Sequence, residues 1–166
     1  DPLGLTRSQF LLGPRETTAQ ALQFDTRKTL EQNQLGATWR HVFADGALRE
    51  TRLAAYGGLR GVAQWLAIAP ATQSAARHGG GVIDFNREFQ GLEWRARWAW
   101  DDVGLVAGLS TDRQRDDRKG FENFTGTGAA QVLGVVGRLR RDEINTAQTR
   151  DAFAQSEWSM SRALSA

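Results

Sequence analysis

The sequence has no cysteine, only two histidines and only three prolines. Without cysteine, disulfides, thiolate nucleophiles and zinc knuckles are excluded, and His41 and His78 leave little for a metal site. No run of ~18 apolar residues occurs, which excludes a transmembrane helix. The chain starts Asp-Pro-Leu-Gly without a basic and apolar leader, so we expect no signal peptide.

The chain has no large excess of charge of either sign. It carries 21 basic and 19 acidic residues for a net charge of +2. The densest basic stretch, at residues 138–141, is followed at once by Asp142 and Glu143. This near balance weakens the case for a nucleic-acid partner that a pI of 9.6 would otherwise suggest. We therefore expect no nucleic acid to bind.

Residues 92–100 show the clearest pattern, an alternation of period two. One face carries only apolar side chains and the other carries mainly charged ones, which is typical of a strand. Tryptophan is enriched at membrane interfaces because its ring is apolar and its N–H is wet. The pattern also fits a soluble strand that buries its aromatics. The two faces hold Leu92, Trp94, Ala96, Trp98 and Trp100 on one side, and Glu93, Arg95, Arg97 and Ala99 on the other.

Upstream of this segment the apolar positions change parity. Ile83, Phe85 and Phe89 occupy odd positions, so the apolar face switches near Gln90-Gly91. A β-bulge at the glycine would produce this switch. A strand that passes from one environment into another would produce it too.

Turn signals separate several strand-like runs. Asp45-Gly46 between two such runs is the strongest hairpin signal in the chain. A second tight turn is expected at residues 101–104. The expected strands cover residues 38–43, 48–66, 83–100, 105–112 and 148–160.

Short turns alternate with long connections along the chain. The connections at about 67–81 and 117–146 are long, whereas those near Asp45 and Asp102 are short. In a meander this gathers short turns at one end and long loops at the other, as in outer-membrane barrels. Strands of about 15–20 residues exceed those of soluble sheets. We predict an all-β fold, an antiparallel up-and-down meander forming a partial transmembrane β-barrel of about five to six long strands.

Five short stretches, in order and spread over most of the chain, resemble the β-barrel of TonB-dependent outer-membrane receptors of the ferric-siderophore branch. They are DPLGLTRSQF at Asp1, FDTRKT at Phe24, GGVIDFNREFQGLEWR at Gly80, KGFENF at Lys119 and LRRDEINT at Leu139. The resemblance implies a large barrel around an N-terminal plug. It also implies uptake of ferric siderophores, driven by a TonB complex at the inner membrane.

Two features of the receptor family are missing from this chain. It has no plug and no TonB box, and its few strands cannot enclose a channel. We therefore interpret residues 1–166 as one partial barrel domain, a fragment of a receptor of the bacterial outer membrane. Its expected partners are a ferric siderophore and outer-membrane lipid, with the TonB complex reached only through the missing plug. The fragment alone should not transport.

The long loops supply candidate ligand-binding residues. Ferric chelates are often anionic, arginine binds carboxylate or phosphate in a bidentate manner, and aromatics give planar contact. The alternative is that these residues only pack the loops against one another or face solvent, without a ligand. The candidates are Trp65, Arg77, His78, Arg118, Lys119, Phe121 and Phe124.

Catalytic and metal motifs are not found. Asp112, Asp116 and Asp117 are interleaved with arginines and lack metal-loop spacing, which favours a salt-bridged strand end. There is no Gly-x-Ser-x-Gly and no P-loop. We expect neither an enzyme nor a bound cofactor or metal. The alternative function is a soluble β-sandwich or small barrel that binds a ligand with its tryptophans.

Overall fold

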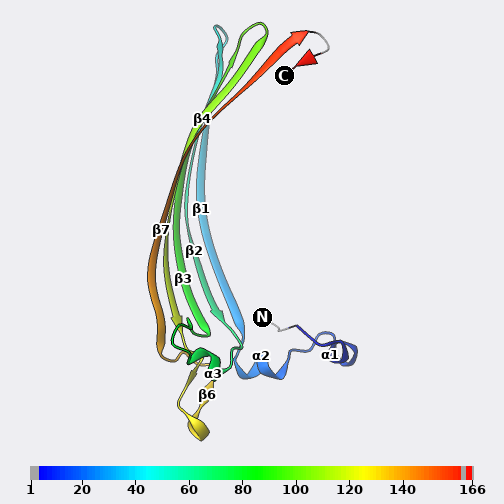
Figure 1. The fold of residues 1–166 in the computed structure, drawn as a ribbon, viewed down its shortest axis with the longest axis vertical. Helices are drawn as coiled ribbons and strands as arrows, with labels where there is room; N and C mark the ends of the chain where they lie inside the picture. The colour runs from blue at the N-terminus through cyan, green and yellow to red at the C-terminus, as the bar shows by residue number, and fades with distance from the viewer. Residues whose placement is uncertain (1–3, 162–163, 166) are drawn as a thin grey trace. The chain divides into compact units, whose positions relative to one another are not determined.

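The computed structural model of the chain describes residues 4–161 and 164–165. Strands account for 62% of the structure and helices for 12%. The main sheet has the order β1-β2-β3-β4-β7-β8, so its strands lie side by side in the order in which they occur along the chain (Figure 1). The strands are antiparallel and the sheet is not closed. The predicted all-β meander is confirmed.

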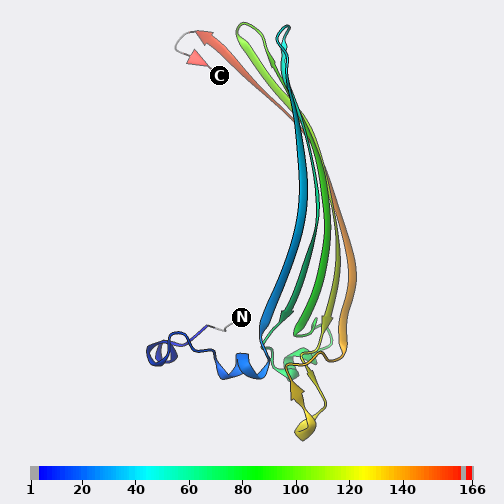
Figure 2. The ribbon, with the colours of Figure 1, turned by 180° about the vertical axis from the view of Figure 1, so that it is seen from behind.

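Five of these strands are long. The main sheet contains β1 (Arg27–Val42), β2 (Leu48–Trp65), β3 (Val82–Ala99), β4 (Val103–Phe121), β7 (Leu139–Ser161) and the short β8 (Leu164–Ser165). A second, two-stranded sheet is formed by β5 (Phe124–Thr125) and β6 (Val132–Leu133) around the 3-10 helix η1 (Gly128–Ala130). The α-helices are α1 (Arg7–Leu12), α2 (Ala19–Gln23) and α3 (Pro70–Gln73); α1 and α2 precede β1 in the chain (Figure 2).

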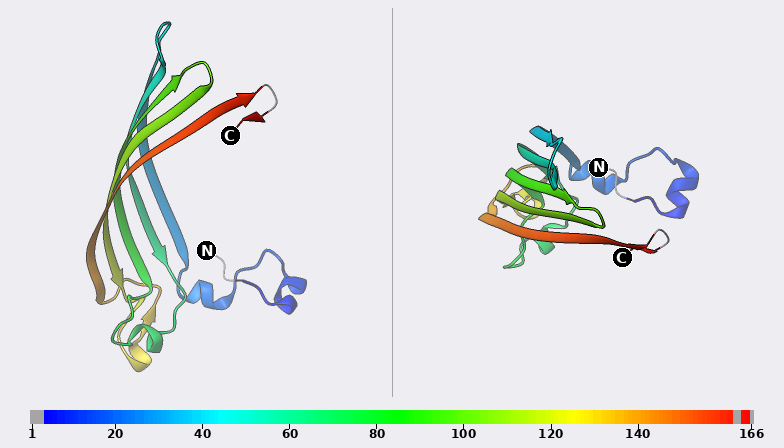
Figure 3. Two further views of the ribbon diagram at one scale, coloured as in Figure 1. Left: turned by 45° about the horizontal axis from the view of Figure 1, so that its top comes forward. Right: turned by 90° about the horizontal axis from the view of Figure 1, so that it is seen from above.

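The described residues form two compact units, and each long strand contributes to both. Unit 1 comprises the chain up to Gln32 together with 60–87 and 116–145, and unit 2 comprises 33–59, 88–115 and the chain from Thr146. Of the two long connections, residues 66–81 follow β2 and residues 122–138 follow β4 (Figure 3). Both belong to unit 1. Both short turns, 43–47 and 100–102, belong to unit 2. The predicted separation of short turns from long loops is therefore confirmed.

Several strands extend beyond their predicted bounds. β1 begins at Arg27 rather than at Thr38, β4 continues to Phe121 rather than ending near Asp112, and β7 begins at Leu139. The loop expected at 117–146 shrinks to 122–138. The segments added to β4 and β7 are mainly polar on both faces, so their backbones pair although no period of two marks them. The segment added to β1 places Leu35 and Ala37 on one face, but Gly36 and the polar run before it weaken the alternation. Five residues predicted in loops lie in strands instead. Arg118, Lys119 and Phe121 lie in β4, Trp65 ends β2, and Phe124 begins the two-residue β5.

The two short turns follow the predicted chemistry. Gly46 has a φ of +83°, which glycine adopts at little cost, and the Phe43 N–H donates to the Arg49 carbonyl at 3.0 Å. At the second turn the Trp100 N–H donates to the Val103 carbonyl at 2.8 Å. Both hairpins thus close where Asp-Gly and Asp-Asp-Val-Gly predicted them.

The three short helices were not predicted, because their apolar spacing is too brief to show a helical period. Thr6 forms a capping box with Gln9 at the start of α1. The Thr18 hydroxyl accepts the Ala21 N–H at the start of α2. Pro70 occupies the first turn of α3, where its missing N–H costs no hydrogen bond. Each helix therefore begins at a standard start signal.

Candidate functional site: a two-faced sheet and a loop cluster

In unit 2, contacts between neighbouring strands define one face of the sheet. Arg40 and Glu50 form an ion pair at 2.7 Å, and the Tyr56 hydroxyl donates to Asp112. A Cβ added at Gly91 would meet both the Tyr56 ring and the Asp112 carboxylate. Side chains in contact across strands lie on the same face of the sheet. These contacts therefore identify which residues of β1, β2, β3 and β4 share one face. We call this the polar face.

Two contacts extend the polar face to β7. The Ser110 hydroxyl lies 3.4 Å from an Asp151 oxygen, and a Cβ added at Gly108 would meet the Phe153 ring. Alternation along each strand then assigns the remaining side chains. The polar face carries Arg40, Glu50, Arg52, Tyr56, Glu93, Arg95, Arg97, Asp112, Asp151 and Glu157.

The opposite side of unit 2 is the apolar face, and each of the five long strands carries on it a run without a charged side chain; we call these runs together the band. Arg49, whose carbonyl accepts the Phe43 N–H, lies on the same face at the turn end of β2, just outside its run. The Trp94 indole donates to the Thr51 hydroxyl at 3.0 Å, which places both on this face. Within unit 2 the band covers nine residues on each of four strands, 35–43, 51–59, 92–100 and 103–111, and seven residues, 152–158, on β7. A run of nine is close to the ~9–11 residues needed to cross a bilayer. The side chains of the band are Leu35, Ala37, Trp39, His41, Phe43, Thr51, Leu53, Ala55, Leu59, Leu92, Trp94, Ala96, Trp98, Trp100, Val103, Leu105, Ala107, Leu109, Thr111, Ala152, Ala154, Ser156 and Trp158, with Gly57 among them.

This apolar face has no protein cover among the described residues. Leu35 is 81% exposed, and Trp39 and Leu109 are each 56% exposed. Among described residues, Ala96 is the single buried hydrophobic residue of unit 2. A soluble sheet normally buries one face against a second layer. The indoles of unit 2 are therefore not sealed in a dry core.

Aromatic residues gather at the turn end of this band. Trp39 stacks on His41 with ring centroids 5.9 Å apart, and His41 meets Phe43 edge-on at 4.5 Å. Trp98 and Trp100 lie beside the second turn. Aromatic belts of this kind mark the membrane–water interface of barrels.

The change of the apolar residues from odd to even positions near Gln90-Gly91 does not come from a β-bulge. It reflects a change in which face of β3 carries the apolar residues. Exposure alternates without interruption from Ile83 to Leu92, with the odd positions the less exposed ones. Phe89 lies on the polar face, where its ring covers Gly58, whereas Leu92 lies on the apolar face. β3 thus keeps its register while the apolar residues move from one face to the other.

In unit 1, Asn123 ties three chain segments together. It is fully buried, and its Nδ2 donates to the carbonyls of Phe24 and Leu66, both at 3.0 Å. Its backbone N–H donates to Gln73 Oε1 at 2.8 Å, and Gln73 Nε2 in turn donates to the Ile68 carbonyl at 2.6 Å. The end of α2, the loop after β2 and the loop after β4 therefore share one buried polar centre.

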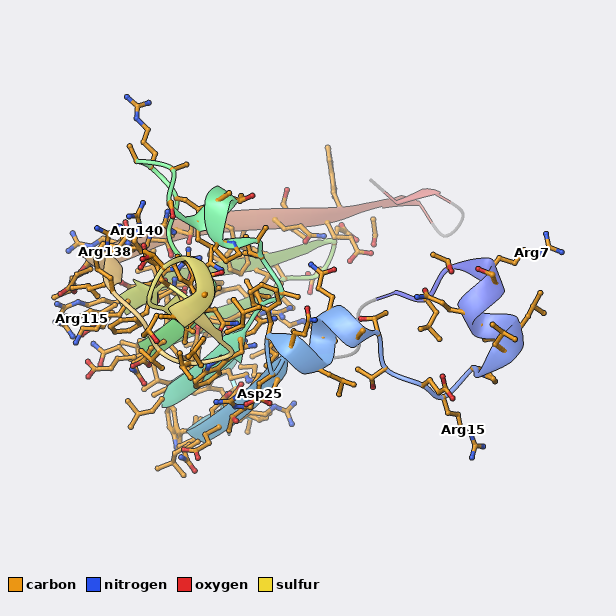
Figure 4. The ribbon with its side chains drawn as sticks, turned by 90° about the horizontal axis from the view of Figure 1, so that it is seen from below. Arg7, Arg15, Asp25, Arg115, Arg138 and Arg140 are labelled. Carbon is orange, nitrogen blue, oxygen red and sulfur yellow. The ribbon has the colours of Figure 1, made fainter. Side chains whose placement is uncertain are left out.

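A second centre in unit 1 is the buried Glu122 carboxylate. Arg138 donates to Glu122 Oε1 at 2.9 Å, and Arg140 reaches the same oxygen at 3.5 Å. Arg140 also donates to the carbonyl of Ala75 and to that of His78 at 3.5 Å. Figure 4 shows both arginines beside the loop that carries β6. The dense basic stretch of the sequence thus holds loops together.

Asp116 on β4 pairs with Arg87 on the neighbouring strand β3. Arg87 Nε and Nη2 each donate to one Asp116 oxygen at 2.8 Å, a bidentate geometry. The hydrogen bond to Asp116 raises the pKa of the Arg87 guanidinium, and burial acts in the opposite direction. The expected salt-bridged strand end therefore exists, with its partner on β3.

The seven ligand-binding candidates all lie in unit 1 but have separate surroundings. The Arg27 guanidinium lies 3.7 Å from the centroid of the Trp65 ring. Arg77 is exposed, and His78 Nδ1 accepts the Gly80 N–H at 3.0 Å. Phe124 is buried and borders a hollow of about 600 Å³ beside Glu122, Thr125, Thr127 and Arg138.

Sequence reasoning missed the residues that organise the loops. Asn123, Gln73 and Glu122 were not singled out, although Asn123 and Glu122 lie within the KGFENF stretch. The run Arg138–Arg141 was noted only for its charge. The sequence did contain one signal, because Glu122 and Asn123 lie between two phenylalanines. Aromatic neighbours favour burial, and buried polar side chains form hydrogen bonds.

Comparison with known proteins adds no family assignment: no protein-family model matches the chain. Across residues 4–161 and 164–165, no helix is long and apolar enough to cross a membrane. The same residues contain no group of three or more side chains suited to hold a metal ion.

Proposed function

We propose that this chain is part of the wall of an outer-membrane β-barrel receptor that takes up ferric siderophores. The uncovered apolar band of unit 2 carries the proposal, because its nine-residue segments match a bilayer and its opposite face is charged. Hydrocarbon would cover the apolar face, and the polar face would line a wet lumen.

The loops of unit 1 support the receptor part of the proposal. Buried polar centres at Asn123 and Glu122 hold two long connections in fixed positions. Fixed loops can present a ligand site at the mouth of a barrel. The siderophore assignment itself depends on the five sequence stretches that resemble the receptor family.

The soluble alternative would require a second layer over the apolar face. A sandwich or small barrel buries its tryptophans, whereas Trp39 and Trp158 are 56% and 54% exposed. An open sheet also leaves unpaired edges, which must pair with further strands. Further strands of the same receptor would satisfy both requirements.

Two adjacent alanines on β2 provide a matched test. Ala55 lies mid-band on the apolar face, and Ala54 lies on the polar face. We expect Ala55→Arg to destabilise the chain in phosphatidylcholine vesicles by ~2–4 kcal/mol, since a charge there would face hydrocarbon. Ala54→Arg places the same side chain among charged neighbours and should cost far less. Urea unfolding followed by tryptophan fluorescence measures both.

Two results would contradict the proposal. Equal costs for the two substitutions would show that neither face contacts lipid. A chain that stays monomeric and folded in buffer without detergent would support the soluble alternative. The receptor part has its own test, because we expect the reading frame upstream of Asp1 to encode a plug and further strands.

A further inference from the structure

Three arginines lie on the apolar face just beyond the band. On β4 the band ends at Thr111, and Arg113 and Arg115 occupy the next two positions on that face. On β7 it ends at Ala152, and Arg150 occupies the next position. Asp112 and Asp151 on the polar face fix this assignment, because their sequence neighbours must point the other way.

No partner within the described residues neutralises these three guanidinium groups. None of them takes part in an ion pair there, in contrast to Arg40 on the polar face. Arg113 and Arg150 are exposed and Arg115 is half-buried. An arginine that ends an apolar surface without forming an ion pair has donors available for an external anion.

The arginines border hollows that also expose apolar side chains. Arg113 and Arg115 line a hollow of about 350 Å³ with Leu59, Glu88 and Gln90. Arg113 lines a second hollow of about 430 Å³, which includes Leu92 and Gln148. Gln148 also lines a third hollow, of about 680 Å³. Arg150 lines this third hollow together with Leu92, Trp94 and Leu109. A ligand in these hollows could therefore contact a guanidinium group and apolar side chains at the same time.

We propose that Arg113, Arg115 and Arg150 bind the phosphate headgroup of a membrane lipid whose acyl chains lie on the band. The inference rests on the proposed membrane position of unit 2. Headgroups lie where hydrocarbon ends, which is the level of these arginines. Basic groups at that level attract anionic lipids, and the guanidinium fork matches phosphate geometry. Glu88 opposes the anion from the same hollow and so limits affinity.

The test measures lipid selectivity with spin-labelled lipids in dioleoylphosphatidylcholine vesicles that contain the chain. Electron paramagnetic resonance resolves motionally restricted lipid at the protein surface. We expect spin-labelled phosphatidic acid to be favoured over spin-labelled phosphatidylcholine by at least about fivefold. Arg113→Gln/Arg115→Gln/Arg150→Gln should reduce this preference to about one, and Glu88→Gln should increase it.

The matched control removes charge from the polar face of the same sheet. Arg95→Gln/Arg97→Gln should leave the selectivity unchanged, because these arginines face away from lipid. Retained selectivity in the triple variant, or an equal loss in the control, would overturn the inference and leave the proposed function standing. Absence of any restricted lipid with the unaltered chain would overturn both.

A further arm separates a lipid from free phosphate. Inorganic phosphate in excess should displace spin-labelled phosphatidic acid no better than sulfate at equal ionic strength. Selective displacement, combined with arginine-dependent binding of inorganic phosphate to the chain in detergent, would assign the site to free phosphate instead. That result would refute the lipid headgroup.

Discussion

Replacing the amide of Asn123 by a carboxyl tests whether one buried side chain holds the loops of unit 1. Asn123→Asp preserves shape but removes the Nδ2 donor that serves the Phe24 and Leu66 carbonyls. It also places an acceptor against two acceptors. The change therefore acts on hydrogen bonding and charge, with no cavity to consider.

The cost follows from the two carbonyls left behind. A buried acceptor without a donor costs ~1–3 kcal/mol, so two cost ~2–6 kcal/mol against local opening. Even the lower figure of ~2 kcal/mol corresponds to about 30-fold faster hydrogen exchange of the backbone amides that are protected only while these loops are closed. The Gly134 N–H, which donates to the Asn123 carbonyl, and the Gly81 N–H are suitable reporters.

The effect should depend on pH in a defined direction. Burial and the facing carbonyl oxygens raise the pKa of the carboxyl introduced by Asn123→Asp above the unfolded value of about 3.9. A raised folded-state pKa means that the variant is least destabilised below that value. It loses stability as the pH rises toward the folded-state pKa. The unaltered chain has no such group there.

Hydrogen exchange read by mass spectrometry over 66–81 and 122–138 provides the measurement. Asn145→Asp, an exposed position on β7, adds the same charge without a buried partner and should leave both segments protected. Less than about threefold acceleration in the Asn123 variant would refute the assigned role. Acceleration confined to one segment would refute the claim that one residue joins them.

Two further substitutions test contacts within the sheet. Gly91→Ala should cost ~1–3 kcal/mol in urea unfolding, because the added methyl group overlaps the Tyr56 ring and the Asp112 carboxylate. The penalty should largely vanish in a Tyr56→Ala background, and an unchanged penalty would disprove the clash. Arg87→Lys should cost ~1 kcal/mol, since lysine cannot reproduce the bidentate pair with Asp116. A double-mutant cycle with Asp116→Asn that shows no coupling would contradict this.

The sequence allowed prediction of those parts of the fold where side chains report the environment. Asp45-Gly46 marked a turn because few other residues reach φ +83°. The alternation from Leu92 to Trp100 marked a strand because successive side chains point to opposite faces of the sheet, and the two faces differ in polarity. The outer parts of β4 and β7 lacked this signal, because both faces there are polar, so their pairing depends on the backbone alone.

The candidate site was less predictable, because its organising contacts join distant residues. Asn123 meets Phe24 across 99 positions and Gln73 across 50, and no local pattern encodes such a pair. Trp94, Trp98 and Trp100 did indicate an apolar face on β3. The corresponding positions on β2 include Ala55 and Gly57, which are too small to show a clear alternation. The band on β2 could therefore be identified only from contacts between strands in the structure.

Under the proposed function, the height of the nine-residue runs of the band determines which bilayer thickness the sheet would match. Nine residues extend about 30 Å along a strand, and a tilt of about 35–45° reduces the height to roughly 21–25 Å. That is shorter than the ~30 Å hydrocarbon layer of an average bilayer, and bacterial outer membranes are thinner than average. Thickness matching alone would favour the thinner membrane, since a mismatch of several ångströms must be absorbed by compressing lipid.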